Sequence, residues 1–307
     1  MMATAVRARN RRVITLVLSI VVVAALAGAI LLAVFFGGAP VASTVPTAGE
    51  STSKPSPSTP SPTTTPTETG FPENTEIYDI SSLPVVDVFS VNPALPRDDD
   101  PFGGSTGQVA QPGAAGAPVF ADPGAPPVAF LPQTQTFEGT VVPVVEAQDH
   151  WVKVLLVGRA GVPPEQSSAQ TFGWIRAADV TLTTLDSHVE VSLSARTIDI
   201  VGGGGSERIA TDFGSGTLDT PTPTGRMFIM MTRTVPDFGY TRGHPLVYLS
   251  AQSPTLAGFS HANVAITAFH YHDERSGEIS NGCLRLAPEA IDRLAELPPG
   301  TLVVVSA

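Results

Sequence analysis

The stretch CLRLAPEAIDRLAELPPGTLVVV, residues 283–305, decides the fold of the C-terminal part of the chain. Pro288 suits the first turn of a helix, and Ile291, Leu294 and Leu297 recur three residues apart on one face of it. The apolar run TLVVV that follows is typical of a buried strand. The stretch therefore predicts one short helix and a closing strand.

Upstream of this stretch, short apolar runs with alternating polar residues predict further strands. They occupy residues 189–203 (as two strands), 226–234, 245–251 and 264–272. We therefore expect a mostly β domain with one short helix at 187–307. A second set of β-like runs separated by Gly and Pro predicts a small β-barrel at 127–184. In this smaller domain Trp151 and Trp174 are interpreted as core residues, with an aromatic ligand platform as the alternative.

The N-terminal third predicts an anchor and a spacer. Residues 13–36 carry no charge, and a helix of that length spans about 36 Å, which is enough to cross a bilayer. Four arginines precede the run, so residues 1–12 are expected in the cytoplasm and the rest outside. A cleaved signal peptide is the alternative, although its apolar core is normally about 7–15 residues long. Residues 37–126 are interpreted as a disordered Pro/Ser/Thr-rich stalk and an extended linker, with one docked strand.

Charge and cysteine content exclude several classes of function. The chain has 17 Lys+Arg against 28 Asp+Glu, a net charge of −11, which argues against a nucleic-acid partner. Its single cysteine excludes an intramolecular disulfide framework and a Cys-based zinc site. No other metal-binding pattern is present, so we expect neither a metal nor a cofactor.

The lone cysteine, Cys283, is the strongest candidate for chemistry. An extracytoplasmic compartment oxidises thiols, so a single free cysteine there suggests a function. Ser280, Asn281 and Gly282 form a tight-turn sequence that presents it, and the glycine permits a close backbone approach. Twelve residues separate it from His270, whose imidazole could accept the thiol proton.

These residues resemble a known family. The segment AFHYHDERSGEISNGCLRL, residues 268–286, is similar to the catalytic motif of the L,D-transpeptidases, and TPTPTGRMFI, residues 220–229, resembles a turn in the same domain. The resemblance covers residues 187–307 and implies an L,D-transpeptidase-like β-sandwich. Residues 127–184 resemble the bacterial SH3-like domains found beside cell-wall enzymes.

The resemblance also implies roles for individual residues. Cys283 matches the nucleophile, and His270, preferred to His272, matches the base. The backbone N–H groups of Gly282 and Cys283 match the oxyanion donors, while Ser280 and Arg285 match positions that line the site.

Two residues depart from the family pattern. Asn281 replaces a histidine, and it keeps a hydrogen-bonding amide without being a base. Tyr271 replaces a small residue, and we expect its bulk to narrow the pocket.

The implied function is that of a membrane-anchored, extracytoplasmic L,D-transpeptidase that forms 3→3 peptidoglycan cross-links. A donor tetrapeptide stem would acylate Cys283, and the amine of another stem would accept the acyl group. Carbapenem β-lactams would be expected to acylate the same thiol. Two alternatives stay open: an L,D-carboxypeptidase using the same site, and a catalytically weak wall-binding module.

Overall fold

A computed structural model describes residues 69–307, and all of them lie in one compact unit. The expected anchor at 13–36 and most of the expected stalk lie outside the described residues. Within residues 69–307, no helix is long and apolar enough to cross a membrane.

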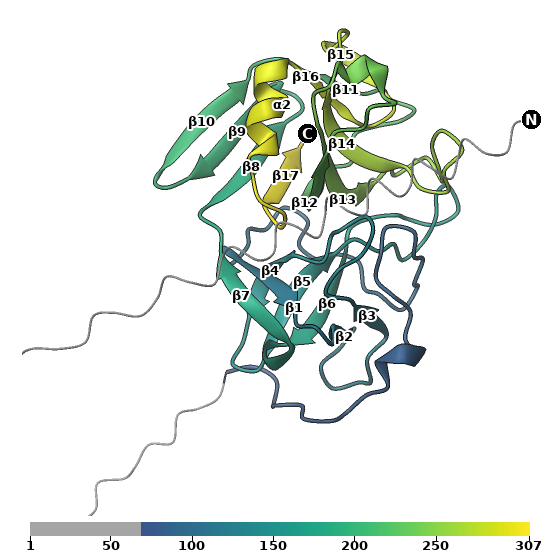
Figure 1. Ribbon diagram of the computed structural model, residues 1–307, viewed down its shortest axis with the longest axis vertical. Helices are drawn as coiled ribbons and strands as arrows, with labels where there is room; N and C mark the ends of the chain where they lie inside the picture. The colour runs from purple at the N-terminus through teal and green to yellow at the C-terminus, as the bar shows by residue number, and fades with distance from the viewer. Residues whose placement is uncertain (1–68) are drawn as a thin grey trace, which may run out of the picture. The chain divides into compact units, whose positions relative to one another are not determined.

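The C-terminal part is built on a ten-stranded sheet of mixed direction (Figure 1). In spatial order its strands are β10 (Gly205–Ala210), β9 (Thr197–Gly202), β8 (Ser187–Ser192), β17 (Leu302–Ser306), β12 (Gly225–Arg233), β13 (Leu246–Gln252), β14 (Ile266–Tyr271), β16 (Leu284–Leu286), β11 (Gly214–Gly216) and β15 (Gly277–Ser280). Helix α2 (Pro288–Ala295) is the only α-helix among the described residues. The prediction of a mostly β domain with one short helix and a closing strand is confirmed.

The two faces of this sheet bury different cores because side chains alternate along each strand. On one face, Ile229, Phe269 and Val303 share a core with Ile291 and Leu294 of α2. We call the opposite face, which carries neighbours such as Phe228 and Leu302, face A. Its middle packs against the N-terminal part of the described chain in a second core.

The N-terminal part holds a five-stranded antiparallel sheet. Its strands in order are β6 (Thr171–Arg176), β5 (Trp151–Leu156), β4 (Val142–Ala147), β1 (Gln108–Pro112) and β7 (Val180–Thr184), and β2 (Ala117–Val119) pairs with β3 (Ala129–Leu131) beside it. Trp151 is fully buried and Trp174 is 8% exposed, which confirms the interpretation of both as core residues. The resemblance of this part to SH3-like domains stays a prediction.

The structure corrects the expected linker at 71–126. Strand β1 from this segment pairs with both β4 and β7, so the sheet begins well before residue 127. Val86, Val88 and Leu95 are buried in the shared core. Val86 and Val88 lie in the strand-like run 77–91, which forms only single bridges, Val85 with Phe130 and Val91 with Arg159, and no strand.

A buried ion pair joins the two parts on face A. Arg226 of β12 donates to both carboxylate oxygens of Asp98, at 2.8 Å from Nε and 2.7 Å from Nη2. Their side chains are 4% and 2% exposed. A third bond, from Arg226 Nη1 to the carbonyl of Gly104, spans 2.9 Å. Arg226 therefore fixes the segment 98–107, which we call the strap.

Candidate active site

Two adjacent parallel strands bring the candidate nucleophile and base together. Strand β14 pairs with β16 so that His270 lies opposite Arg285 and Phe269 opposite Leu284. Phe269 and Leu284 belong to the core under α2. His270 directly follows Phe269, and Cys283 directly precedes Leu284. Because side chains alternate along an extended chain, both His270 and Cys283 lie on face A.

His270 is held as a neutral base. Its side chain is buried, and Nδ1 lies 2.8 Å from the backbone carbonyl oxygen of Tyr271. A carbonyl only accepts hydrogen bonds, so Nδ1 carries the proton and Nε2 is left with its lone pair. The pKa of His270 is lowered to about 4, mainly by burial. The hydrogen bond to Tyr271 raises this pKa, and the charges of Arg285 and His272 lower it.

Cys283 is held as a neutral thiol. Burial raises the pKa of this thiol above its ordinary value, while a hydrogen bond from the Ala268 backbone and the charge of Arg285 act in the opposite direction. The pKa shifts of Cys283 and His270 both favour an uncharged pair at pH 7. The sulfur then becomes a strong nucleophile only when its proton passes to the imidazole.

The turn before Cys283 is fixed by Ser280. Its hydroxyl donates to the carbonyl of Cys283 at 2.6 Å and accepts from the N–H of Gly282 at 3.1 Å. Gly282 has φ +106°, a conformation that favours glycine, and a Cβ there would lie 3.3 Å from the carbonyl oxygen of Pro221. The Thr220 hydroxyl donates to the carbonyl of Ser280 at 3.1 Å. The 220–222 turn therefore braces the turn that presents the thiol.

This bracing changes the expected roles of two residues. Ser280 is only 3% exposed and holds the turn together. Because the N–H of Gly282 already donates to Ser280, the N–H of Cys283 is the better candidate for an oxyanion donor. Asn281 is exposed.

Arg285 supplies positive charge beside the pair. Its side chain is 18% exposed, and its nearest carboxylate, that of Glu274, lies 4.0 Å away. Nη1 reaches the carbonyl of Glu274 at 3.4 Å, and the buried Nε has no hydrogen-bond partner among the described residues. This guanidinium therefore keeps donor capacity for a ligand.

Tyr271 does not narrow the pocket as expected. It follows His270 directly on β14, so alternation turns its ring to the opposite face, where it joins the core under α2. Its hydroxyl donates to Asp273 at 2.6 Å. Tyr271 contributes its backbone carbonyl to the site, as the acceptor that orients His270.

Two tyrosines that the sequence analysis missed lie beside the thiol. Burial, and then the nearby Cys283, raises the pKa of Tyr240 to about 12. Its ring meets that of His270 edge-on, with centroids 5.4 Å apart. Tyr248 on β13 lies opposite Ala268, and burial raises its pKa as well. Only the pairing of β13 with β14, which the sequence does not specify, could have revealed Tyr248.

His272 lies half-buried near the same rings. Its centroid is 5.7 Å from that of Tyr240 and 6.3 Å from that of His270. Its Nδ1 accepts from the backbone N–H of Glu274 at 3.0 Å.

Among the described residues, no group of three or more His, Cys, Asp or Glu side chains is arranged to hold a metal.

A family model matches the C-terminal part of the chain. Residues 186–305 match the family model of the L,D-transpeptidase catalytic domain, named YkuD. No curated protein matches the chain.

Solved L,D-transpeptidases are among the structural neighbours. One from Mycobacterium smegmatis is 13% identical with a TM-score of 0.31, covering 52% of this chain and 91% of its own. One from Stackebrandtia nassauensis is 22% identical with a TM-score of 0.29, covering 41% of this chain. The catalytic domain from Enterococcus faecium is 24% identical with a TM-score of 0.26, covering 39% of this chain and 96% of its own. The present chain spans 57% of the S. nassauensis protein.

Proposed function

We propose that this protein is an L,D-transpeptidase that forms 3→3 cross-links between peptidoglycan stem peptides through an acyl-enzyme on Cys283. The observation that carries the proposal is the parallel pairing of β14, which contains His270, with β16, which begins directly after Cys283, within a segment that matches the catalytic-domain family. The chemistry follows from the neutral state of the pair.

In the first half-reaction, Cys283 Sγ attacks the carbonyl carbon of the third residue of a donor tetrapeptide. The thiol proton moves to Nε2 of His270, and negative charge develops on the carbonyl oxygen. The N–H of Cys283 is the proposed donor to that oxygen. His270 then returns the proton to the departing amine of the terminal D-alanine as the C–N bond breaks, leaving a thioester.

In the second half-reaction, the side-chain amine of another stem attacks the thioester. His270 takes a proton from the amine, and the thiol leaves when the new amide forms. The buried Tyr271 carbonyl that accepts from Nδ1 stabilises the transient imidazolium. Arg285 is proposed to bind the C-terminal carboxylate of the donor, because its guanidinium has no close carboxylate partner among the described residues and lies beside the reacting pair.

The segment before residue 69 is proposed to hold the enzyme at its substrate. The apolar run 13–36 would anchor it in the cell membrane with the catalytic part outside, and the Ser/Thr/Pro-rich segment would let it reach the wall. Both points rest on the sequence.

Intact-mass spectrometry of the full-length protein with a carbapenem and with a tetrapeptide stem tests the proposal. The wild type should gain the mass of each acyl group, and Cys283→Ala should gain none. His270→Gln should acylate at least about 100-fold more slowly, which is the lower end of the usual contribution of a general base.

Product analysis with a tetrapeptide and an amine acceptor then separates cross-linking from trimming. A 3→3 dimer supports the transpeptidase, whereas tripeptide alone would assign a carboxypeptidase. A folded wild type that forms no adduct with either compound would refute the enzymatic proposal and favour the wall-binding alternative.

A further inference from the structure

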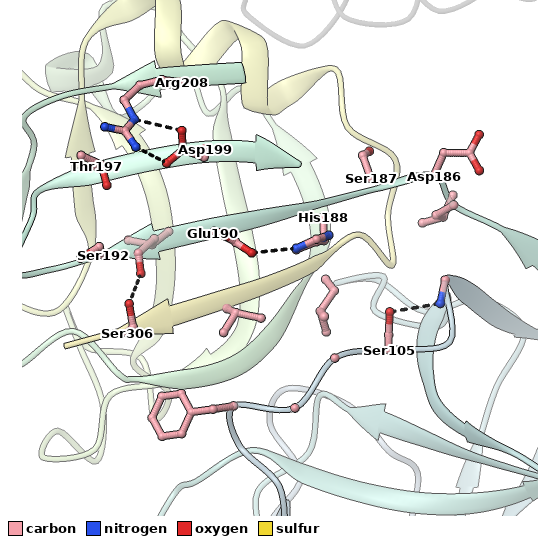
Figure 2. Close-up of a pocket in the computed structure, with 18 residues that line it drawn as sticks. Ser105, Asp186, Ser187, His188, Glu190, Ser192, Thr197, Asp199, Arg208 and Ser306 are labelled. Carbon is pink, nitrogen blue, oxygen red and sulfur yellow. Dashed lines mark hydrogen bonds and ion pairs between the residues drawn. The ribbon is translucent and has the colours of Figure 1, made fainter. Parts of the chain in front are cut away.

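Face A carries a concave site far from Cys283. A cavity of about 730 Å³ lies between the strap and strands β8, β9 and β17 (Figure 2). In the order of the sheet, β8 and β14 are separated by β17, β12 and β13. At a strand spacing of about 4.8 Å, the cavity therefore lies roughly 20 Å from the catalytic strand. Between these two ends, face A is covered by the N-terminal part.

Hydrogen bonds to the rest of the protein hold the strap in place, so the cavity exists before a ligand binds. Arg226 binds Asp98 and the carbonyl of Gly104, and the backbone N–H of Arg226 donates to the carbonyl of Pro101. At the other end of the strap, the N–H of Leu185 donates to the carbonyl of Gly107 at 2.8 Å. Such a wall does not have to order itself when a ligand binds, which preserves affinity.

The strap nevertheless leaves an aromatic ring in solvent. Phe102 lines the cavity and is 60% exposed, although its neighbours are held on both sides. Leu302 and Val304 of β17 contribute aliphatic surface to the same cavity. An exposed ring on a fixed backbone is suited to stack on a flat apolar surface of a ligand.

Planar polar groups from neighbouring strands complete the lining. Arg208 donates two bonds of 2.9 Å to the carboxylate of Asp199, and His188 lies 3.2 Å from Glu190. Figure 2 shows both pairs projecting from the same side of the sheet. Each pair fixes its partners in place while leaving other donors and acceptors available for hydroxyl or amide groups.

The charge of the lining restricts the ligand. Asp186, Glu190 and Asp199 carry negative charge, and Arg208 is the one Lys or Arg in the lining. This balance disfavours phosphate-rich or other anionic polymers. A sugar ring suits this lining, because its hydroxyl groups can hydrogen-bond to the polar side chains and its C–H bonds can pack on an aromatic ring.

We propose that this cavity, the strap groove, binds a neutral saccharide chain, with Phe102 stacking on a sugar ring and the Asp199–Arg208 pair hydrogen-bonding to its polar groups. Resting on the proposed function, the ligand is the glycan strand of peptidoglycan. Binding there would hold the wall polymer against the enzyme while stem peptides enter the catalytic end of face A.

Calorimetric titration of the full-length protein tests this proposal with two neutral probes. One is an N-acetylglucosamine tetramer, and the other is glycan strands stripped of their peptides, with the exposed lactyl carboxylates converted to amides. Phe102→Ala should weaken binding of the strands at least 10-fold, and Asp199→Asn should weaken it several-fold. Phe89→Ala is the matched control, because Phe89 is also exposed, at 43%, and lies outside the groove. It should bind as the wild type does.

Carbapenem acylation of Cys283, measured on the same samples, separates the two proposals. Normal acylation together with no binding of either probe overturns the groove proposal alone. Equal weakening by Phe102→Ala and Phe89→Ala also overturns it. Groove-dependent binding in a protein that forms no acyl adduct supports a saccharide site and refutes the enzymatic function.

Discussion

Two arginines on the same face of the same sheet have opposite surroundings. In the covered middle of face A, Arg226 is bound by both oxygens of Asp98 and by a carbonyl of the strap. At the catalytic end, Arg285 has no carboxylate nearer than 4.0 Å, and its buried Nε has no partner among the described residues. This difference indicates separate roles for the two arginines. The hydrogen bonds of Arg226 are made within the protein, whereas Arg285 keeps hydrogen-bond donors for a ligand.

The largest effect should come from breaking the middle region. Arg226→Met leaves the 2% exposed Asp98 side chain without its partner, which should lower the free energy of unfolding by about 3–5 kcal/mol. Urea denaturation measures this loss. The double variant Arg226→Met, Asp98→Asn removes the unpaired charge and should recover part of it. A loss below about 1 kcal/mol would mean that the pair does not hold the two parts together.

The Asp98–Arg226 pair also marks the limit of what the sequence could predict. The run DDD at 98–100 is typical of an exposed turn, and nothing near it indicates a buried arginine 128 residues further along. Helix α2 and the strands around Cys283 were predictable because their signals are local and periodic.

The site residues also divide into those with a local sequence signal and those placed by contacts between distant parts of the sequence. A compact motif predicts Cys283 and His270 as the reacting pair, and the pairing of β14 with β16 brings the two ends of that motif side by side. The reversed role of Tyr271 needs only strand alternation, whereas the positions of Tyr240 and Tyr248 depend on which strands become neighbours.

The second effect concerns the buried base at the catalytic end. An unfolded chain binds a proton at His270 below a pKa of about 6.5, whereas burial keeps the folded protein unprotonated there to about pH 4. Stability is therefore present above pH 6.5 and lost as the pH falls toward 4, by about 3 kcal/mol.

Urea denaturation of the wild type and of His270→Gln between pH 7 and pH 4 isolates this contribution, because other groups titrate in both proteins. The variant should lose about 3 kcal/mol less across the range. Parallel curves for the two proteins would contradict a strongly lowered pKa. The acid limb of carbapenem acylation should also lie near pH 4 in the wild type, since Nε2 must be free to accept the thiol proton.

The third effect sharpens the contrast between the arginines. Arg285→Met should leave the free energy of unfolding nearly unchanged, because no close ion pair is lost. Acylation by a tetrapeptide stem should fall about 10- to 100-fold, which corresponds to a charge-assisted hydrogen bond of roughly 1.5–3 kcal/mol. A stem whose C-terminal carboxylate is amidated provides the control and should acylate both proteins equally slowly. If the variant reduced the two rates by the same factor, Arg285 would not bind that carboxylate.

The smallest effect compares two glycines, one in each region. Gly225 has φ +103° directly before Arg226, and Gly282 has φ +106° directly before Cys283. A Cβ would lie 3.1 Å from the Cβ of Pro101 at the first position and 3.3 Å from a carbonyl oxygen at the second.

Alanine at either glycine should therefore cost a similar amount of stability, about 1–3 kcal/mol, for the strained backbone. Only Gly282→Ala should slow acylation of Cys283, because only that turn positions the N–H and sulfur of the nucleophile. Denaturation curves and intact-mass time courses on the two variants measure both quantities. Equal slowing by Gly225→Ala would mean that the covered middle of face A also controls the catalytic geometry, so the two regions would act as one.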